Sequence, residues 1–283
     1  MSAGGAVLSA ARLRELLGSW NARLHGALHR LGRAASPRPV HQARVAARSL
    51  RSLLCTLGPL LRPDLLARAR RDLRNIAIEL EEVREADVRR ERLTALAESR
   101  RALTPGAQRQ LVLALERDQE AARRRFLGHA RSAGFRERAE RLIATLGDPR
   151  LVVARGDVAQ ITLRRLRKRW KRLRRALRSG HADPEALHEL RLAVKHARYA
   201  SEALMPLLGI DPQPYEQQLK RMQDCLGEHH DAIDALEWLE GLGEPVGPIL
   251  AAPLRPEIRR VLRRCERQLD RLAARLEVPA WPT

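Results

Sequence analysis

Apolar residues recur at intervals of three and four along almost the whole chain, and alternating β-branched runs are nearly absent. Intervals of three and four place apolar side chains on one face of an α-helix, whereas a half-buried strand needs an interval of two. The pattern therefore predicts an all-α protein. The expected helices cover residues 7–31, 37–57, 63–100, 107–146, 150–178, 184–208, 214–240 and 255–277.

Glycine and proline separate these segments, because neither suits a helix interior. The expected breaks are Ser36-Pro37, Gly58-Pro59, Thr104-Pro105-Gly106, Gly147-Asp148-Pro149, Asp183-Pro184, Gly209 with Asp211-Pro212, and Gly247-Pro248. Ser36 and Asp183 are predicted N-caps. Each precedes a proline at the first helical position, where the missing N–H has no intrahelical acceptor in any case.

The two predicted N-caps begin an internal repeat. After each cap, one histidine and three cationic residues follow at the same spacing, with a constant offset of 147 residues. The first set is His41, Arg44, Arg48 and Arg51, and the second is His188, Arg191, Lys195 and Arg198. Residues 73–86 also match residues 219–232, at an offset of 146. We expect an internal duplication that gives two four-helix bundles, residues 1–147 and 148–283, related by a pseudo-twofold around a central basic groove.

At 100° per residue, each set of four residues falls on one face of its helix, opposite apolar residues such as Leu50 and Val194. We call these two sets the basic stripes. Each is about 15 Å long, from about ten residues at 1.5 Å each. One phosphate cannot cover that length, whereas a chain of phosphates can.

Charge supports an anionic partner. Lys and Arg number 54 against 34 Asp and Glu, which gives a formal net charge of +20. Four of these cations are lysines, Lys168, Lys171, Lys195 and Lys220. Guanidinium forks suit bidentate phosphate binding, although a chain rich in Ala, Arg, Leu and Pro also reflects genomic base composition.

A charged stripe is often only a solvated helix face, but such a face normally interleaves acids at i+4, and the stripes contain none. The segment from Arg164 to Arg178 carries ten further basic residues and no acid. Nucleic acid is a competing partner for such a helix. Only 3% of the residues are aromatic, which leaves few rings to stack on single-stranded bases, while duplex DNA bound by its phosphates stays possible.

Acidic and polar residues follow each stripe: Glu79, Glu81, Glu82, Glu85 and Asp87, then Glu228, His229, His230, Asp231 and Asp234. They form either a metal or acid–base site around Glu82 and Glu228 or a set of carboxylates that orient neighbouring arginines. Without an HExxH or His-x-x-Glu motif, a Walker loop or a GxSxG turn, we favour the second interpretation. We expect no metal, no cofactor and no catalytic residue.

Cys55, Cys225 and Cys265 form neither an even set nor a CxxC pair, which is typical of a reducing cytoplasm. The start of the chain does not resemble a signal peptide, and no run of about 18 apolar residues occurs. We expect a soluble cytoplasmic protein with no membrane association. The sequence leaves its oligomeric state open.

The paired segments HQARVAARSLR (41–51) and HELRLAVKHARY (188–199) resemble the two halves of a CHAD domain, a histidine-bearing domain of two four-helix bundles. Residues 80–88 and 226–233 are similar to its LGxxRDxxV segments, with Glu81-Glu82-Val83-Arg84-Glu85 and His230 as departures. The resemblance covers nearly the whole chain. It implies a basic central surface that binds inorganic polyphosphate, and association with polyphosphate granules. The ExExK signature of the CYTH triphosphatase often fused to such domains is absent, so we expect no enzymatic activity.

On this interpretation the phosphate oxygens are bound by Arg44, Arg48, Arg51, Arg191, Lys195 and Arg198, with Arg74 and Lys220 as flanking contacts. His41 and His188 would add hydrogen bonds and, when protonated, charge. A bound polyanion should raise the pKa of both histidines, so binding should weaken as pH rises through the raised value. The alternatives are a nucleic-acid-binding protein, a metal-dependent phosphohydrolase and a scaffold for acidic proteins.

Overall fold

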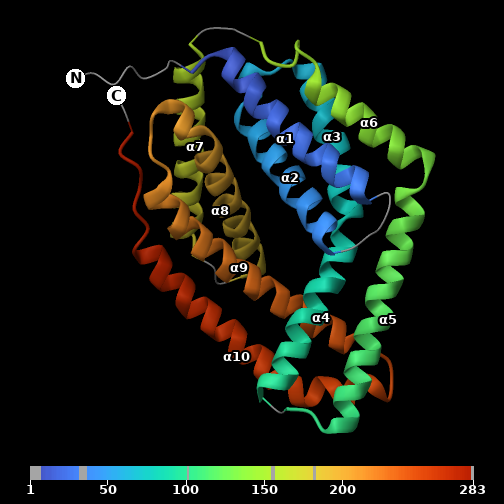
Figure 1. The fold of residues 1–283 in the computed structure, drawn as a ribbon. Coiled ribbons are helices and arrows are strands. Elements are labelled where there is room, and N and C mark those ends of the chain that lie inside the picture. Colours follow the sequence, from blue (N-terminus) through green and yellow to red (C-terminus); the bar gives the residue numbers. More distant parts are fainter. Residues whose placement is uncertain (1–7, 32–36, 101, 154–156, 181–182, 282–283) are drawn as a thin grey trace.

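The computed structural model describes residues 8–31, 37–100, 102–153, 157–180 and 183–281. The described residues are helical almost throughout, which confirms the all-α prediction (Figure 1). Extended pairing among them is limited to an isolated bridge between Leu61 and Val152. The elements are α1 (Ala10–Leu31), α2 (Pro37–Thr56), η1 (Gly58–Leu60), α3 (Pro63–Glu79), α4 (Glu81–Arg100), α5 (Pro105–Ala130), α6 (Ala133–Gly147), α7 (Val158–Arg178), α8 (Pro184–Leu204), η2 (Pro206–Leu208), α9 (Gln213–Glu240) and α10 (Val246–Ala274).

The helices pack in two groups that meet where α2 contacts α8. In the first group, α1 packs on α2 and α6, and α3 packs on α2 and α6. In the second group, α7 packs on α8, α8 on α9, and α9 on α10 (Figure 1). Because α2 and α8 carry the basic stripes, the fold brings together two segments that are 147 residues apart in the sequence.

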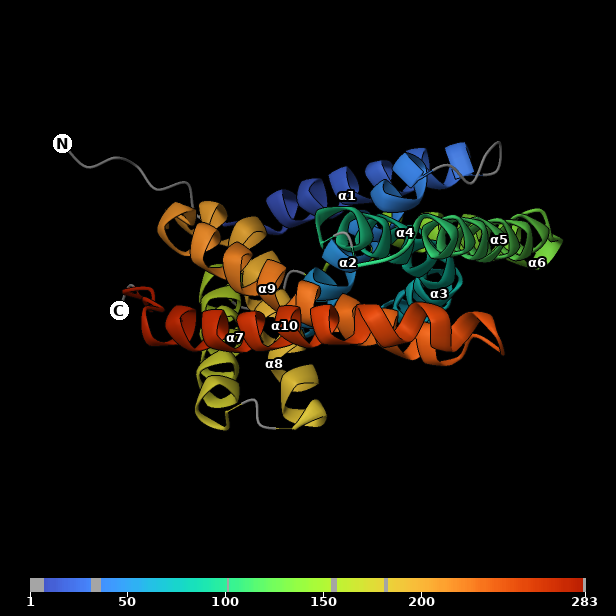
Figure 2. The same cartoon turned by 90° about the horizontal axis from the view of Figure 1, so that it is seen from below.

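Helices α4 and α5 extend from the first group towards the second. The N-terminal part of α10 packs against the ends of α4 and α5, and α4 also packs along α9 (Figure 1). In the view from below, α10 and α1 lie on opposite sides of the molecule, and α7 and α8 project past α10 (Figure 2). Since α4 also contacts α2, the four helices α2, α4, α8 and α9 form a closed set around one site.

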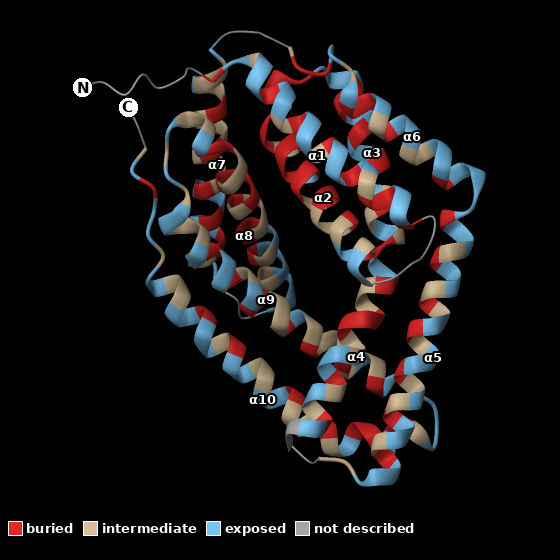
Figure 3. Cartoon of the chain, viewed as in Figure 1, coloured by how far each residue is buried: buried red, intermediate tan, exposed pale blue. Residues whose placement is uncertain are grey.

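Two apolar cores hold the helices together, and residues from both halves of the chain contribute to each. The larger core is continuous across residue 147 and includes Leu50 of α2, Leu73 of α3 and Trp170 of α7. Figure 3 shows buried residues along α2, α3 and α7. The smaller core joins α4 and α5 to α9 and α10, through residues such as Leu93 and Leu254. Burial of apolar surface is the main force behind such packing. The two halves therefore stabilise each other.

Trp170 fixes the orientation of α7. Buried residues recur every three or four positions in this helix, at Thr162, Leu166, Trp170, Leu173 and Ala176. The Trp170 indole is 1% exposed and donates a hydrogen bond from Nε1 to the Ser201 hydroxyl of α8, at 2.9 Å. The cationic residues of α7 are therefore turned away from the apolar core, and two of them, Arg165 and Arg169, bond to the end of α2.

Short polar side chains cap several helices as expected. The Asp183 carboxylate accepts a hydrogen bond from the Ala186 N–H at 2.8 Å, which confirms the predicted N-cap of α8. The Ser36 prediction lies outside the described residues. Thr104 caps α5 in the same way, and Gly209, at φ 69°, ends η2 in the left-handed region that favours glycine.

Two predicted long helices are each broken in the structure. The segment 63–100 divides at Leu80 into α3 and α4, and 107–146 divides at residues 131–132 into α5 and α6. Ser132 starts α6 by accepting a hydrogen bond from the Phe135 N–H at 3.2 Å. Apolar residues recur at helical spacing on both sides of each break, so periodicity alone could not reveal either one.

Two predicted helix starts were wrong. The helix expected at 150 begins at Val158, where Asp157 is the N-cap, because Leu151 and Val152 pair with the chain around Leu61. The helix expected at 255 begins at Val246, so Gly247-Pro248 is not a break. Pro253 and Pro256 lie inside α10, whose apolar face packs into the smaller core and compensates for their missing N–H donors.

Candidate functional site

A pocket of about 330 Å³ lies among α2, α4, α8 and α9, and we call it the central pocket. It opens where the two basic stripes approach each other. Its lining combines six cationic side chains, six carboxylates and two histidines. The residues are His41, Arg44, Arg48, Glu81, Arg84, Glu85, Val88, Arg92, Arg191, Lys195, Gln223, Asp224, Gly227, Glu228, His230, Asp231 and Asp234.

The structure brings half of the predicted binding residues into this pocket. They are His41, Arg44, Arg48, Arg191 and Lys195. The other predicted residues lie outside the lining. Arg51, Arg74, His188 and Lys220 are exposed on α2, α3, α8 and α9, respectively. The pocket thus takes three residues from the first stripe and two from the second.

Arg198, the last residue of the second stripe, is mostly buried and is engaged by its own neighbours. Its Nε donates to the Gln223 side-chain oxygen at 3.4 Å, and its guanidinium lies 3.7 Å from a carboxylate oxygen of Glu202. The guanidinium carbon also lies 4.8 Å from the centre of the Tyr199 ring. These contacts hold Arg198 beside the central pocket and not in it.

Four cations from the two stripes are close enough to perturb one another. Burial lowers the pKa of Lys195 to about 7, and Arg191, Arg48 and Arg44 lower it further in that order. Burial likewise lowers the pKa of Arg44 and of Arg191, and Arg48 adds to both effects. Removal from water and mutual repulsion both disfavour the charged forms. An anion placed among these groups would reverse the second effect.

Histidines on either side of these cations are held neutral. Burial lowers the pKa of His41, and Arg84, Arg48 and Arg44 lower it further. Burial also lowers the pKa of His230 to about 4, with Arg191 and Lys195 adding to the shift. Both imidazoles are therefore neutral near pH 7 in the free protein, and each can donate or accept a hydrogen bond.

Carboxylates line the α4 and α9 side of the pocket, so the groove is not uniformly positive as the stripes predicted. Glu81 lies 3.6 Å from the Arg44 guanidinium, whose Nη1 also donates to the Leu80 carbonyl at 3.4 Å. Asp231 lies 3.7 Å from the Arg92 guanidinium. These contacts match the orienting role that the sequence favoured for the acidic segments.

Two of these carboxylates, Glu85 and Asp231, have raised pKa values. Burial raises the pKa of Glu85, and Glu81 and Asp234 raise it further. Burial also raises the pKa of Asp231, which the charges of Arg92 and Arg191 partly oppose. Both acids therefore hold a proton more readily than an exposed carboxylate, which reduces their repulsion of an incoming anion.

Sequence reasoning missed two cationic residues of the lining, Arg84 and Arg92. Arg84 could have been found, because the repeat aligns it with His230, and both side chains reach the pocket. Arg92 has no cationic counterpart in the second half. Its position depends on the packing of α4 against α9, which periodicity does not reveal.

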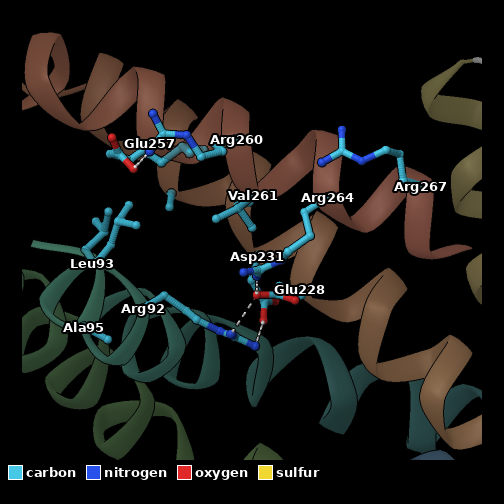
Figure 4. Close-up of a pocket in the computed structure, with 14 residues that line it drawn as sticks. Arg92, Leu93, Ala95, Glu228, Asp231, Glu257, Arg260, Val261, Arg264 and Arg267 are labelled. Carbon is cyan, nitrogen blue, oxygen red and sulfur yellow. Dashed lines mark hydrogen bonds and ion pairs between the residues drawn. The ribbon is translucent and has the colours of Figure 1, made fainter. Parts of the chain in front are cut away.

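A second cavity, of about 480 Å³, lies between α4, α9 and α10 and shares a wall with the central pocket (Figure 4). Arg92, Glu228 and Asp231 line both spaces. Figure 4 shows Arg92 and Arg264 reaching Glu228 from opposite sides, from α4 and α10. This ion-pair network forms part of the wall between the two spaces.

Among the described residues, no group of three or more His, Cys, Asp or Glu side chains is arranged to hold a metal ion. Within the same residues, none of the helices combines the length and apolar character that crossing a bilayer requires.

The family model for the CHAD domain matches residues 11–240. Two solved structures share the fold. PptA from Streptomyces chartreusis is 20% identical with a TM-score of 0.75, and the match covers 94% of this chain and 99% of that chain. The CHAD domain from the plant Ricinus communis is 18% identical with a TM-score of 0.71, covering 100% of this chain and 97% of that chain. No curated protein matches the chain significantly. Because the family model spans most of its length, the chain belongs to the CHAD domain family.

Proposed function

We propose that the protein binds inorganic polyphosphate at the central pocket, without catalysing its cleavage, and associates through this site with polyphosphate granules in the cytoplasm. Arg44, Arg48, Arg191 and Lys195 are the proposed phosphate ligands. His41 adds a hydrogen bond at one edge. The family resemblance implies the same ligand class independently of the geometry.

The observation that carries this proposal is the convergence of four cations from segments far apart in the sequence. Among the described residues, Arg48 and Lys195 have no hydrogen bond or ion pair, and the buried Nε of Arg191 has no hydrogen-bond partner. Carboxylates among the described residues also line the pocket, but none of them pairs with Arg48 or Lys195, and burying cationic side chains without hydrogen-bond acceptors costs free energy. A bound chain of phosphates would supply the missing acceptors.

The same pocket supports the proposed duplication of residues 1–147 and 148–283. Arg48 and Lys195 are equivalent residues of the repeat, and both line the pocket. Glu85 and Asp231 are also equivalent, and burial raises the pKa of each. A site that lies on a pseudo-twofold axis would show this pairing of like residues. Such a site would offer similar contacts on both sides of the axis, which suits a polyphosphate chain because its two directions are chemically equivalent.

The decisive test is a titration with polyphosphate over a series of salt concentrations, comparing the wild type with the double variant Arg48→Glu, Lys195→Glu. Because the logarithm of affinity falls linearly with the logarithm of salt concentration, the slope counts the phosphates neutralised. We expect the double variant to lose at least about a hundredfold in affinity, since two attractive contacts become repulsive. Circular dichroism should show unchanged helicity.

A matched control changes net charge by the same amount away from the site. Arg109 and Arg117 are exposed on α5, which does not line the central pocket. The variant Arg109→Glu, Arg117→Glu should keep affinity within about threefold, since only screened long-range attraction is lost. Equal losses in the two double variants would mean that net charge, and not the pocket, binds the polymer.

Two other outcomes would replace the proposal. Preference for duplex DNA over long-chain polyphosphate, in competition at physiological salt, would indicate a nucleic-acid-binding protein. Release of phosphate from polyphosphate with Mg²⁺ or Mn²⁺, lost in Glu82→Gln or Glu228→Gln, would indicate a phosphohydrolase.

A further inference from the structure

A second cationic surface lies on α7, outside the central pocket, and we call it the α7 groove. It is a depression of about 710 Å³ with eight cationic side chains and one acid. The charged lining residues are Arg164, Arg165, Arg167, Lys168, Arg169, Lys171, Arg172, Arg175 and Glu189. Unlike the central pocket, with its equal numbers of cations and carboxylates, this groove is almost uniformly positive.

The fold holds these cations in place from behind. The apolar side of α7 is buried, and Trp170 is tied to Ser201 of α8. Arg165 donates to the Thr56 and Cys55 carbonyls at 3.2 and 3.4 Å, and Arg169 donates to the Thr56 hydroxyl at 3.2 Å. These bonds fix α7 against the C-terminal end of α2, where the carbonyl groups carry partial negative charge.

Three outer cations of the groove face solvent. Lys168, Arg172 and Arg175 are exposed, and the structure shows no hydrogen bond or ion pair between them and any described residue. A run from Arg164 to Arg175 covers about 16 Å of helix. A linear polyanion could contact the groove over this length.

The α7 groove adjoins the first basic stripe at the C-terminal end of α2. Arg51 is exposed on α2, about one turn after Arg48 of the central pocket and one turn before Cys55. The Cys55 carbonyl accepts a hydrogen bond from Arg165 of the groove at 3.4 Å. Arg51, which the central pocket leaves outside, therefore lies on α2 between the two sites.

Resting on the proposed function, we infer that the α7 groove is a second subsite for the same polyphosphate chain, which runs from the central pocket past Arg51 onto α7. The central pocket would hold a short segment, and the groove would bind only chains long enough to reach it. Chain-length preference would then reside in α7.

The lining favours polyphosphate over single-stranded nucleic acid. Among the described residues, no aromatic side chain lines the groove, and the Trp170 ring is buried beneath it, so these residues offer bases no ring to stack on. Densely spaced cations along one helix instead match a polymer with a charge on every unit. Duplex DNA, whose phosphates can be bound without stacking, is tested directly below.

The experiment titrates two probes, tripolyphosphate and long-chain polyphosphate, into three proteins by calorimetry over a salt series. They are the wild type, the groove variant Lys168→Gln, Arg172→Gln, Arg175→Gln, and a control with the same charge change, Arg109→Gln, Arg117→Gln, Arg263→Gln. Arg263 is exposed on α10 and lines neither site. All substituted residues are exposed, so the fold should be retained, which thermal melts would verify.

We expect the groove variant to lose about tenfold or more in affinity for the long chain. The slope of log affinity against log salt concentration should fall in magnitude by about 2, because three fewer phosphates are neutralised. The variant's affinity for tripolyphosphate should stay within about threefold of the wild type, as should both affinities of the control. Unchanged long-chain affinity, or equal loss for both probes, would overturn the inference while leaving the proposed function intact. Failure of the wild type to bind either probe would overturn both.

A parallel titration with duplex DNA separates the two polyanions. If the groove variant loses duplex binding but keeps long-chain polyphosphate binding, the groove is a nucleic-acid site and the inference is wrong.

Discussion

Lys195 should act as a pH-sensitive ligand. Its pKa lies at about 7 because it is buried beside Arg191, Arg48 and Arg44, with Glu81 as the opposing charge. Bound phosphate would raise that pKa, so the complex favours the protonated amine. Affinity is therefore full below about pH 7 and falls as pH rises from there towards the raised value in the complex. We expect roughly a fivefold loss between about pH 7 and pH 8, measured by calorimetry at constant ionic strength.

The variant Lys195→Arg is the control for this titration, because a guanidinium stays charged throughout the range. It should bind as tightly as the wild type at low pH and lose less affinity by about pH 8. Any remaining dependence below about pH 7 would come from His41, whose pKa is lowered by burial and Arg84. A wild-type pH profile in Lys195→Arg would place the titrating group elsewhere.

In the ligand-free protein, Lys195 should reduce stability. Its pKa is lower in the folded than in the unfolded chain, so the unfolded state binds more protons between about pH 7 and 10 and stability rises with pH there. Replacing it by methionine removes the buried amine and keeps its volume. We expect Lys195→Met to raise the free energy of unfolding at about pH 7 by roughly 1–4 kcal/mol, seen by urea denaturation.

A stabilised variant that also binds polyphosphate less tightly would fit a residue selected for binding. Destabilisation by the same change would mean that Lys195 makes favourable contacts in the folded state, which its lack of a hydrogen bond or ion pair to any described residue argues against.

At the level of single residues, the sequence could place Arg44, Arg48, Arg191 and Lys195 because helical spacing and the repeat both select them. It could not tell them from Arg51 or His188, which belong to the same stripes but are exposed outside the pocket lining. That distinction depends on where two helices contact each other. Only the tertiary structure fixes this point.

At the level of elements, the junction between α9 and α10 depends on Gly247. A Cβ atom added there would lie 2.2 Å from the Leu242 carbonyl oxygen, a backbone atom that cannot move aside without distorting the turn. We expect Gly247→Ala to lower the free energy of unfolding by about 1–3 kcal/mol, measured by chemical denaturation, because the smaller core must shift to relieve the clash.

Gly128, inside α5, is the matched control. A Cβ atom there would meet no atom within 4 Å, so Gly128→Ala should raise stability by up to about 1 kcal/mol through helix propensity alone. If both variants had the same effect, the close approach at Gly247 would be of no consequence for the fold.

The existence and type of most elements could be predicted from periodicity, but their ends could not. The start of α10 was predicted wrongly because proline usually marks a helix boundary. Here Pro248 occupies the first turn of the helix, and Pro253 and Pro256 lie further in. Apolar residues misled the prediction for α7, since Leu151 and Val152 are buried in an extended segment and not in a helix. In both cases long-range packing outweighed a local signal.

At the level of the whole molecule, the net charge of +20 works against compactness, and the larger core that both halves share must overcome it. The sequence shows the excess charge directly, and the duplication into residues 1–147 and 148–283 stays a prediction. The sequence could also predict carboxylates that orient neighbouring arginines, as Glu81 does with Arg44 within the first half. It could not predict pairs that join the two halves, such as Arg92 with Asp231, because these depend on the packing of α4 against α9.

A polyanion that bridges α2 and α8 should therefore stabilise the entire fold, because its ligands come from both groups of helices. At a free polyphosphate concentration about a hundred times its Kd, binding to the native state alone contributes about 2.7 kcal/mol. For a chain of this size we expect Tm to rise by about 5 °C, measured by calorimetric melting.

Sodium chloride at matched ionic strength should give a smaller shift, because it screens repulsion without bridging the helices. The variant Arg48→Glu, Lys195→Glu should show only that smaller shift, while Arg109→Glu, Arg117→Glu should keep the full one. If chloride reproduced the whole effect, the stabilisation would arise from screening of the net charge, and the central pocket would not be needed to explain it.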